Sequence, residues 1–325
     1  MGWIELSINT TDEGVDWVYT LLPQVNYTGD IQVNPIQTPS VNFKSDSSPW
    51  KFNIFLYLVN DANINARITQ IDQLFSSLRR TNMVSELELS KVDQIPNKVE
   101  TSENQVHHVG EIFTIISSQT ADQFPKNKNK ITDKIIIKLK PSLAFGSGLH
   151  PATVLCLQLL KEYVKPQMKV LDLGSGSGIL SIAAAKLGGN VVAIDNDPIA
   201  VKSTQETVNL NQLEPQIQVL EASLGHGATL GHWMGGQARN HVSHIPAEKN
   251  FDLIVANIFA RIHISLAAEY FQALRQNNTS GGILITSGFT RDYEESVTAA
   301  LTKQKFTKIN SKQLNEWIAI AYTAK

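Results

Sequence analysis

Apolar residues recur along the chain at two spacings, one of two residues and one of three to four, and these spacings predict its strands and helices. In the first part of the chain, the alternating pattern predicts four strands, at residues 3–9, 31–36, 52–58 and 86–89. A helical period predicts two helices, at residues 11–22 and 62–78. The order of strand, helix, strand, strand, helix and strand is typical of a ferredoxin-like α+β domain.

The rest of the chain follows a different pattern. Residues 96–130 are rich in polar side chains and predict a linker that is interrupted by one strand at residues 111–116. Beyond it, helical patterns separate seven predicted strands, at residues 134–139, 169–172, 191–195, 217–220, 251–256, 282–286 and 317–322. This alternation predicts an α/β domain with a mostly parallel sheet, helices on both faces, and a ligand beyond the carboxyl ends of the strands.

We therefore expect a chain of 325 residues to form two domains joined by a linker. The expected parts are a ferredoxin-like domain of residues 1–95, a linker of residues 96–130 and an α/β domain of residues 131–325. The first domain has no obvious catalytic constellation. Its expected role is the recognition of a substrate.

One glycine-rich turn carries most of the chemical information. After the predicted strand that ends at Asp172, glycines stand at positions 174, 176 and 178, and a helical pattern follows. A dinucleotide fingerprint would need its third glycine where the chain has Ile179 or Ser181, so NAD is not expected. Such a turn can also be purely structural, and by itself it is weak support for a ligand.

Asp195 strengthens the cofactor interpretation because it follows the next predicted strand. The Gly-x-Gly-x-Gly turn, that strand and its terminal acid resemble the S-adenosylmethionine site of Rossmann-like methyltransferases. In that arrangement Asp195 accepts hydrogen bonds from both ribose hydroxyls, while Gly174 and Gly176 let the backbone approach the ligand. Asp197 and Pro198 then predict the start of the following helix.

Composition narrows the remaining possibilities. Hydrophobic residues make up 42% of the chain and charged residues 18%, with a formal net charge of −2. No apolar run reaches the roughly 18 residues of a membrane span, and the first residues do not have the pattern of a secretion signal, so we expect a cytoplasmic location and no membrane. The single cysteine, Cys156, excludes an internal disulfide and a cysteine-built metal site. Its apolar helical surroundings predict a buried side chain.

Two local clusters invite a binding role. Six lysines crowd one short region with a single acid, Asp133: Lys126, Lys128, Lys130, Lys134, Lys138 and Lys140. This run can be a solvated edge or a contact for an acidic or RNA-bearing partner, and the lack of interleaved aromatic residues favours the solvated edge. We expect no direct sequence-specific binding of nucleic acid.

The second cluster lies within residues 223–249, a long connection between two predicted strands. It holds four histidines, His226, His232, His241 and His244. No pattern of Asp, Glu or Cys ligands accompanies them, so no metal site is expected.

Three further motifs, together with the glycine turn, indicate a family. They are Leu-Ala-Phe-Gly-Ser-Gly-Leu-His-Pro-Ala-Thr at residues 143–153, Val-Ala-Asn-Ile-Phe-Ala at 255–260 and Ser-Gly-Phe at 287–289. Together with the glycine turn they resemble the ribosomal protein L11 methyltransferase family. The resemblance is specific over residues 143–197, 251–260 and 281–289 and looser over the first third of the chain. It implies a ferredoxin-like substrate domain joined to a Rossmann-like class I methyltransferase domain that methylates amino groups of a ribosomal protein.

The resemblance also implies site residues. Thr153, Gly174, Asp195 and Asn257 fall on family positions that contact the cofactor, and residues 145–153 are expected to cover it. In the family's threonine-rich loop, however, this chain has Ser147, Leu149 and Ala152 in place of three threonines. These departures keep two alternatives open: a methyltransferase for another protein or a small molecule, and a cofactor-binding module without catalysis.

The chemistry of methyl transfer makes modest demands. Displacement at a sulfonium methyl group needs an aligned, uncharged amine and a shielded site, and no covalent nucleophile. Asn257 can accept a hydrogen bond from the amine or hold the cofactor, although an asparagine at this position can also simply form a turn. His150 can take a proton, but before Pro151 it is more readily explained as an organiser of the loop. No catalytic residue is assigned.

Overall fold

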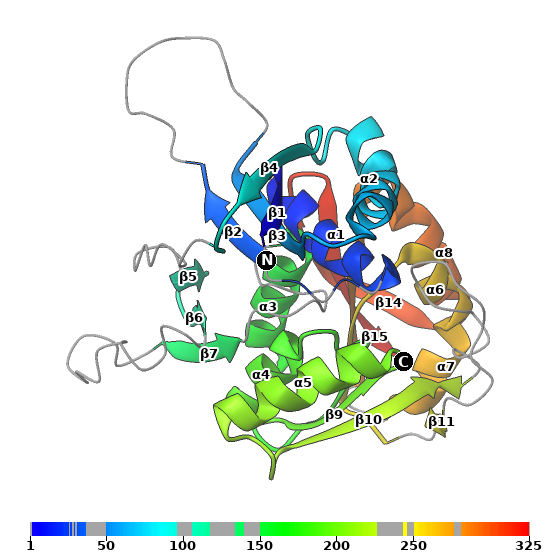
Figure 1. The fold of residues 1–325 in the computed structure, drawn as a ribbon. Helices are drawn as coiled ribbons and strands as arrows, with labels where there is room; N and C mark the ends of the chain where they lie inside the picture. The colour runs from blue at the N-terminus through cyan, green and yellow to red at the C-terminus, as the bar shows by residue number, and fades with distance from the viewer. Residues whose placement is uncertain are drawn as a thin grey trace, which may run out of the picture. The chain divides into compact units, whose positions relative to one another are not determined.

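The structure is a computed structural model that describes residues 2–25, 27, 29, 31–36, 50–95, 106–117, 134–139, 150–225, 243–245, 250–275 and 281–324. The chain forms two compact units, Met1–Asn104 and Gln105–Lys325, which we describe separately (Figure 1). No helix in the described ranges is long and apolar enough to cross a membrane.

The smaller unit has the predicted ferredoxin-like order. Its elements are β1 (Trp3–Thr10), α1 (Asp12–Leu21), the 3-10 helix η1 (Leu22–Val25), β2 (Ile31–Pro35), β3 (Phe52–Val59), α2 (Ile64–Arg80) and β4 (Glu88–Val92). The strands form one antiparallel sheet in the order β2-β3-β1-β4. The alternation along β1 buries Ile4, Leu6 and Ile8, as a sheet with one covered face requires. The hydroxyl of Thr11 caps α1 by accepting from the Gly14 N–H at 3.0 Å.

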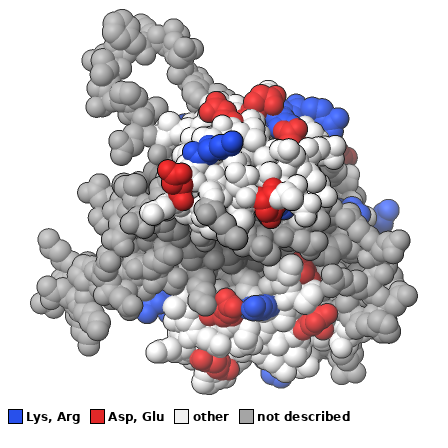
Figure 2. Space-filling model, viewed as in Figure 1, with Lys and Arg blue, Asp and Glu red and all other residues white. Residues whose placement is uncertain are grey.

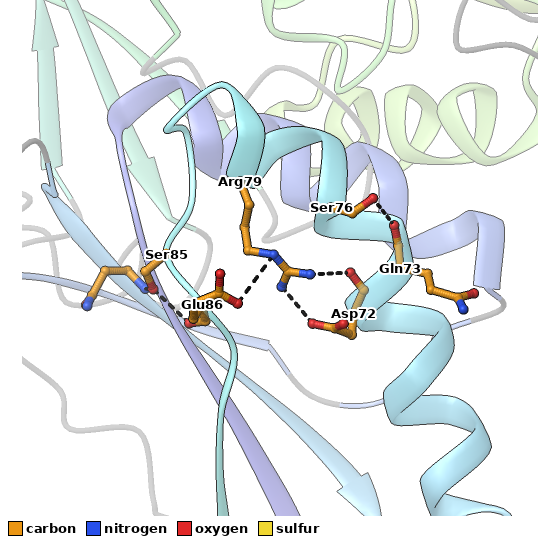
Figure 3. Close-up of polar contacts among 7 residues, drawn as sticks. Asp72, Gln73, Ser76, Arg79, Ser85 and Glu86 are labelled. Carbon is orange, nitrogen blue, oxygen red and sulfur yellow. Dashed lines mark hydrogen bonds and ion pairs between the residues drawn. The ribbon is translucent and has the colours of Figure 1, made fainter.

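The end of α2 is tied to the segment that leads into β4 (Figure 3). Arg79 donates from Nη1 to the Asp72 carboxylate at 2.7 Å and from Nη2 to the Asp72 carbonyl at 2.9 Å. Its Nε lies 3.6 Å from a carboxylate oxygen of Glu86. The Arg79 side chain is largely buried but both carboxylates are exposed, so the double contact with Asp72 is the main tie and the contact with Glu86 adds little.

The larger unit contains most of the chain. Its first strands are β5 (Val106–Val109), β6 (Phe113–Ser117) and β7 (Ile135–Leu139). The elements that follow are α3 (Pro151–Tyr163), β8 (Lys169–Leu173), α4 (Ile179–Lys186), β9 (Asn190–Asp195), α5 (Pro198–Asn211), β10 (Ile217–Leu224), β11 (Ser243–Ile245), β12 (Leu253–Asn257), α6 (Ala260–Ser265), α7 (Ala267–Ala273), β13 (Ile283–Thr290), the 3-10 helix η3 (Arg291–Tyr293), α8 (Glu294–Lys303), β14 (Phe306–Leu314) and β15 (Trp317–Ala324).

Eight of these strands form the main sheet, in the order β11-β10-β9-β8-β12-β13-β15-β14. The strands from β11 to β13 are parallel, and β15 and β14 are antiparallel to their neighbours. The strand order reverses between β8 and β12, which is where ligands bind in sheets of this kind. The mostly parallel α/β sheet predicted from the sequence is confirmed, and its strand order is Rossmann-like.

Helices cover both faces of this sheet. Residues such as Val170 and Val191 face one core with α3 and α4, while Leu171 and Ile194 face a second core with α7 and α8. Figure 1 shows α4 and α5 (green) on the side of β9 and β10 that faces the viewer. Because β8 and β9 are largely buried on both sides, they are apolar apart from their first residues and the buried acids Asp172 and Asp195, which explains why they were predictable.

The strand predicted at residues 134–139 has a different partner from the one expected. It forms β7, which pairs with β6 in a separate sheet of order β5-β6-β7 and does not enter the main sheet. On β7 the backbone of Lys138 is hydrogen-bonded to the side chain of Asn211 of α5. The Lys138 N–H donates to the amide oxygen at 3.1 Å, and the amide nitrogen donates to the Lys138 carbonyl at 2.7 Å. The interpretation as a main-sheet strand was therefore wrong, since an apolar run shows burial but not the identity of the neighbour.

Three strands were not predicted at all: β5, which lies within the expected linker, β11 and β14. The sequence of β14 is mostly polar, because this strand lies at the edge of the sheet and exposes most of its side chains. The short β11 extends the opposite edge and comes from the long connection after Ser223. On the face shown in Figure 2, basic and acidic side chains are interspersed over the described residues, in keeping with a net charge of −2.

Candidate active site

The glycine turn joins β8 to α4 at the carboxyl edge of the main sheet. Gly174, Gly176 and Gly178 have φ values of +75°, +55° and +83°, in the left-handed region that glycine adopts without strain. The N–H groups of Gly174 and Ser175 both donate to the Ile194 carbonyl, at 2.9 and 3.0 Å. The turn is therefore fixed to the end of β9, the strand that carries Asp195.

Asp195 is only 2% exposed and is held by two backbone donors. Its Oδ2 accepts from the Gly176 N–H at 3.0 Å, and its Oδ1 accepts from the Asp197 N–H at 3.0 Å. A carboxylate accepts through both oxygens, so these two bonds fix the orientation of the group. The structure thus brings three predicted residues together, Gly174, Gly176 and Asp195.

Helix α5 supports the turn from behind. Its start has the predicted form, because Asp197 Oδ1 accepts from the Ile199 N–H at 3.0 Å and Pro198 is the first helical residue. Further along, Thr204 donates its hydroxyl to the Gly176 carbonyl at 3.0 Å and lies 2.9 Å from the Ser175 hydroxyl. A Cβ on Gly178 would lie 3.2 Å from Thr204, so this glycine also allows the close approach of α5.

A pocket opens beside the turn and offers about 430 Å³ of empty space, including its mouth. Gly174, Asp195, Asn196 and Ser223 supply its polar groups. The remaining wall is apolar and is formed by Leu173, Ile194, Ala222, Leu224, Ile258, Ile262 and Leu266. An apolar pocket with a few convergent polar groups suits a small ligand that has a flat apolar part and a hydroxylated part.

Asn257 and Thr153 form the second part of the site. Asn257 ends β12, whose neighbour β8 leads directly into the glycine turn, so both lie at the same edge of the sheet. Its Nδ2 donates to the Thr153 hydroxyl at 3.2 Å, whereas its Oδ1 is buried without a hydrogen-bond partner among the described residues. The side-chain bond therefore reaches a distant helix, unlike that of a simple turn-forming asparagine.

Thr153 lies in the first turn of α3. Helix α3 begins at Pro151, and the Thr153 N–H donates to the His150 carbonyl at 2.9 Å. This backbone donor is therefore already bonded within the first turn of the helix. Its hydroxyl accepts from Asn257 and keeps its own proton for another acceptor. Residues 145–149 of the expected covering loop lie outside the described residues.

His150 is a helix cap. Its Nδ1 accepts from the Ala152 N–H at 3.2 Å, and its ring meets Trp317 edge-on with centroids 4.3 Å apart. Burial lowers the pKa of His150 to about 4, so the imidazole is neutral at physiological pH. These contacts favour the loop-organising role over that of a general base.

Beneath the turn lies a buried acid that the sequence analysis did not single out. The Asp172 carboxyl is fully buried and accepts from the Ser181 hydroxyl, and its Oδ1 has no hydrogen-bond partner among the described residues. Burial raises its pKa to about 6. The buried Cys156 lies close enough for the charge on Asp172 to raise the pKa of the thiol, although burial is the main cause of that shift. The predicted burial of Cys156 is confirmed.

Residues on β13 close the site on the other side. Ser287 pairs in register with Asn257, and its hydroxyl donates to the Ile318 carbonyl at 2.9 Å. Gly288 has a φ of +90°, and a Cβ there would lie 2.6 Å from the backbone of Ile258. The serine and glycine of the motif at 287–289 thus allow β13 to pass directly against the turn that follows Asn257.

Most residues of the histidine and lysine clusters lie outside the described part of the chain. Of the four histidines, His226, His232 and His241 lie outside the described residues, whereas His244 is on β11, 3.5 Å from the Ser223 hydroxyl. No group of metal-binding side chains occurs within the described ranges. Of the lysine run, only Lys134 and Lys138 are described.

Comparison with known proteins decides the family. The model of the family described as "Ribosomal protein L11 methyltransferase (PrmA)" matches residues 2–325. The chain therefore belongs to this family. A ribosomal protein L11 methyltransferase of Herpetosiphon aurantiacus is 33% identical over 333 aligned positions, covering 99% of this chain and 99% of the relative. One from Chloroflexus aurantiacus is 34% identical and covers 98% of this chain and 97% of its own length.

A solved structure agrees with the family assignment. The crystal structure of a ribosomal protein L11 methylase from Lactobacillus delbrueckii subsp. bulgaricus superimposes with a TM-score of 0.53 at 28% identity. It covers 68% of this chain and 99% of that protein. As a member of the ribosomal protein L11 methyltransferase family, the chain is an S-adenosylmethionine-dependent protein methyltransferase. Its apolar pocket, the acid beside it and the unpartnered Asn257 carbonyl fit this cofactor.

Proposed function

We propose that this chain transfers methyl groups from S-adenosylmethionine to amino groups of ribosomal protein L11. The family match and the named relatives support both the reaction and the substrate. The observation that carries the proposal is the buried Oδ1 of Asn257. This oxygen has no hydrogen-bond partner among the described residues and lies at the sheet edge that also holds the glycine turn. A substrate of this class also favours a cytoplasmic location.

We assign the cofactor to five residues. Asp195 accepts the ribose hydroxyls, with its carboxylate oriented by the Gly176 N–H. Gly174 lines the pocket and leaves room for the ligand beside the backbone. Thr153 and Asn257 lie at the same sheet edge as the turn, next to Ile258 of the pocket wall, and the Thr153 hydroxyl proton and the Asn257 carbonyl are assigned to the polar end of the cofactor or the incoming amine.

The chain's own groups perform a positioning task. Bound S-adenosylmethionine supplies an electrophilic methyl group on a sulfonium sulfur. The Asn257 carbonyl accepts a hydrogen bond from the neutral amine and so aims the nitrogen lone pair, while the Thr153 bond keeps the amide from rotating. The apolar wall, which includes Ile258, limits the access of water. We assign no residue to the removal of the proton that an ammonium group must first lose.

We further propose that the smaller unit recognises the substrate protein and that the larger unit binds the cofactor. The larger unit contains all five assigned residues. The smaller unit is a complete antiparallel sheet with two helices, and no metal-binding cluster occurs among its described residues. A division of this kind lets one fold select the protein while the other carries out the chemistry.

The test is a transfer assay with purified components. The protein is incubated with radiolabelled S-adenosylmethionine and with L11 from cells that lack methylation of this protein. Labelled L11 is expected, and the Asp195→Ala variant should incorporate much less label than the wild type at a cofactor concentration near the wild-type Kd. If the wild type binds S-adenosylhomocysteine in a calorimeter but labels no L11, the substrate assignment is wrong.

A further inference from the structure

We propose that His263 positions Asn257 for methyl transfer by holding the carbonyl of Ser287. This inference rests on the proposed role of Asn257 as the group that orients the amine. His263 lies on α6, fully buried, six residues beyond Asn257 and outside the pocket wall. Its imidazole does not line the pocket, and it acts on the backbone beside Asn257 through the Ser287 carbonyl, with a further interaction at the Ile258 backbone.

The imidazole of His263 has a defined hydrogen-bond direction. Its Nε2 lies 2.9 Å from the Ser287 carbonyl, which can only accept, so Nε2 carries the proton. Burial lowers the pKa of His263 to about 4, which leaves the ring neutral, and Nδ1 is then an acceptor. The Tyr270 hydroxyl lies 3.2 Å from Nδ1 and donates to it. Burial raises the pKa of Tyr270, so this hydroxyl keeps its proton.

The same Ser287 oxygen also holds the backbone beside Asn257. The N–H of Ile258, the next residue, donates to it at 3.0 Å. Two donors from one segment, Ile258 and His263, therefore converge on one carbonyl of β13. This arrangement closes the turn between β12 and α6 into a rigid loop, since both ends are bonded to the same atom.

Packing holds the loop from the other side. The His263 ring meets the Phe289 ring edge-on at 5.4 Å. Gly288, between Ser287 and Phe289, leaves no space between β13 and Ile258. The imidazole and the Ile258 N–H therefore both restrain the backbone beside Asn257 through the same Ser287 carbonyl. A single polar side chain in an apolar core, such as His263, usually contributes only to the stability of the fold. The test therefore has to distinguish an effect on folding stability from an effect on the position of Asn257.

Two substitutions distinguish the two ring nitrogens. Glutamine places an amide nitrogen close to the position of Nε2, so His263→Gln keeps a donor for Ser287. Asparagine reaches only as far as Nδ1, so His263→Asn keeps the contact with Tyr270 and loses Ser287. We expect His263→Asn to lower kcat for L11 methylation at least tenfold, with KM for L11 changed less than threefold. His263→Gln should restore most of kcat, and the Tm of both variants is measured alongside.

Repeating the His263 substitution in the Asn257→Ala variant tests whether the effect of His263 on kcat depends on Asn257. If His263 acts through Asn257, His263→Asn should change the remaining kcat less than twofold in that background, because coupled residues are not additive. An equal tenfold loss in both backgrounds, or equal losses for the glutamine and asparagine variants, would overturn the proposal.

A readout without substrate keeps this inference separate from the proposed function. In ¹⁵N spectra of the full chain, the Asn257 side-chain amide signal is assigned by its absence in Asn257→Ala. It should shift or broaden in His263→Asn and stay near its wild-type position in His263→Gln. An unchanged signal in both variants sinks the positioning role even if the wild type methylates L11. A shifted signal sustains it even if L11 is not the substrate.

Discussion

The side-chain amide of Asn257 donates to the hydroxyl of Thr153 at 3.2 Å, although 104 residues separate the two in the chain. One residue ends a strand of the main sheet and the other lies in the first turn of α3. Their bond leaves the Asn257 carbonyl with one orientation, because an amide that donates on one side must present its oxygen on the other. Orientation of the proposed amine acceptor thus depends on a residue that need not touch the amine.

Removal of the Thr153 hydroxyl tests this dependence. Thr153→Val keeps the shape of the side chain but leaves the Asn257 N–H buried and without its acceptor, at a cost of about 1–3 kcal/mol. We expect kcat for L11 methylation to fall about tenfold or more. Thr153→Ser is the matched control, since it keeps the hydroxyl, and it should retain most of the activity. Equal rates for the valine and serine variants would show that the hydroxyl has no role.

Asp195 is expected to dominate cofactor affinity. Asp195→Ala removes the proposed ribose contacts and also frees the Gly176 and Asp197 N–H groups that the carboxylate now accepts. Affinity for S-adenosylmethionine should fall at least tenfold, or about 1.4 kcal/mol, by calorimetric titration. Asp197→Asn is the control, because asparagine also caps helices well and should keep α5 in place. An Asp195→Ala variant that binds as tightly as the wild type would remove Asp195 from the site.

A fragment of residues 105–325 should separate binding from protein recognition. This fragment contains the whole larger unit and is expected to bind S-adenosylhomocysteine within about threefold of the full chain, yet to lose methylation of L11. Full methylation by the fragment would give the smaller unit another purpose.

A shorter fragment that starts at Ile131 provides a contrast in stability. It lacks β5 and β6 and so loses Phe113 and Ile115, two buried members of the core that contains α3. Each such side chain contributes about 1.5–3 kcal/mol when fully buried. A lower Tm than that of the longer fragment is expected, and an equal Tm would show that the small sheet adds no stability.

The buried Asp172 makes a defined contribution to the pH dependence of stability. Burial raises its pKa from 3.8 to about 6, so between these pH values the folded chain binds a proton that the unfolded chain has lost. The contribution of Asp172 to the free energy of unfolding therefore falls as the pH rises from about 4 to about 6. At about 1.4 kcal/mol per pH unit, the fall is on the order of 3 kcal/mol.

Asp172→Asn isolates this effect because asparagine imitates the protonated acid. Urea unfolding at pH 4, 5, 6 and 7 should show the variant gaining stability relative to the wild type as the pH rises, with little further gain above about 6. Burial lowers the pKa of His150 and His263, which gives the opposite slope, but both histidines are present in the two proteins and cancel in the difference. A difference that does not vary with pH would contradict the raised pKa.

The parts of the site that the sequence predicted are those formed by local chain geometry. The turn at Gly174 and Gly176, the acid at the end of β9 and the cap of α5 each lie within a few residues of the strand or helix that positions them. Thr153 and Asn257 entered through a resemblance to a family, and nothing in their spacing shows that they touch. The pairing of β7 with β6 was missed for the same reason, since an apolar run does not name its partner.

His263 is the clearest case of a residue whose contacts could not be predicted from the sequence. In the sequence it is a single histidine on an apolar helix, and such residues are usually part of the core. Its partners lie 7 and 24 residues away, at Tyr270 and Ser287, and the second contact is to a backbone oxygen that any residue could supply. No side-chain pattern could have indicated it. The buried Asp172 was visible in the glycine motif, but its raised pKa depends on the packing above and below the sheet.

The hydrogen-bonded shape of the glycine turn affects the association rate of the cofactor. The amides of Gly174, Ser175 and Gly176 are already engaged by Ile194 and Asp195, so the loop holds its shape before any ligand arrives. Little conformational entropy then has to be surrendered on association, and the association rate should be set by diffusion into the pocket and not by a slow folding step.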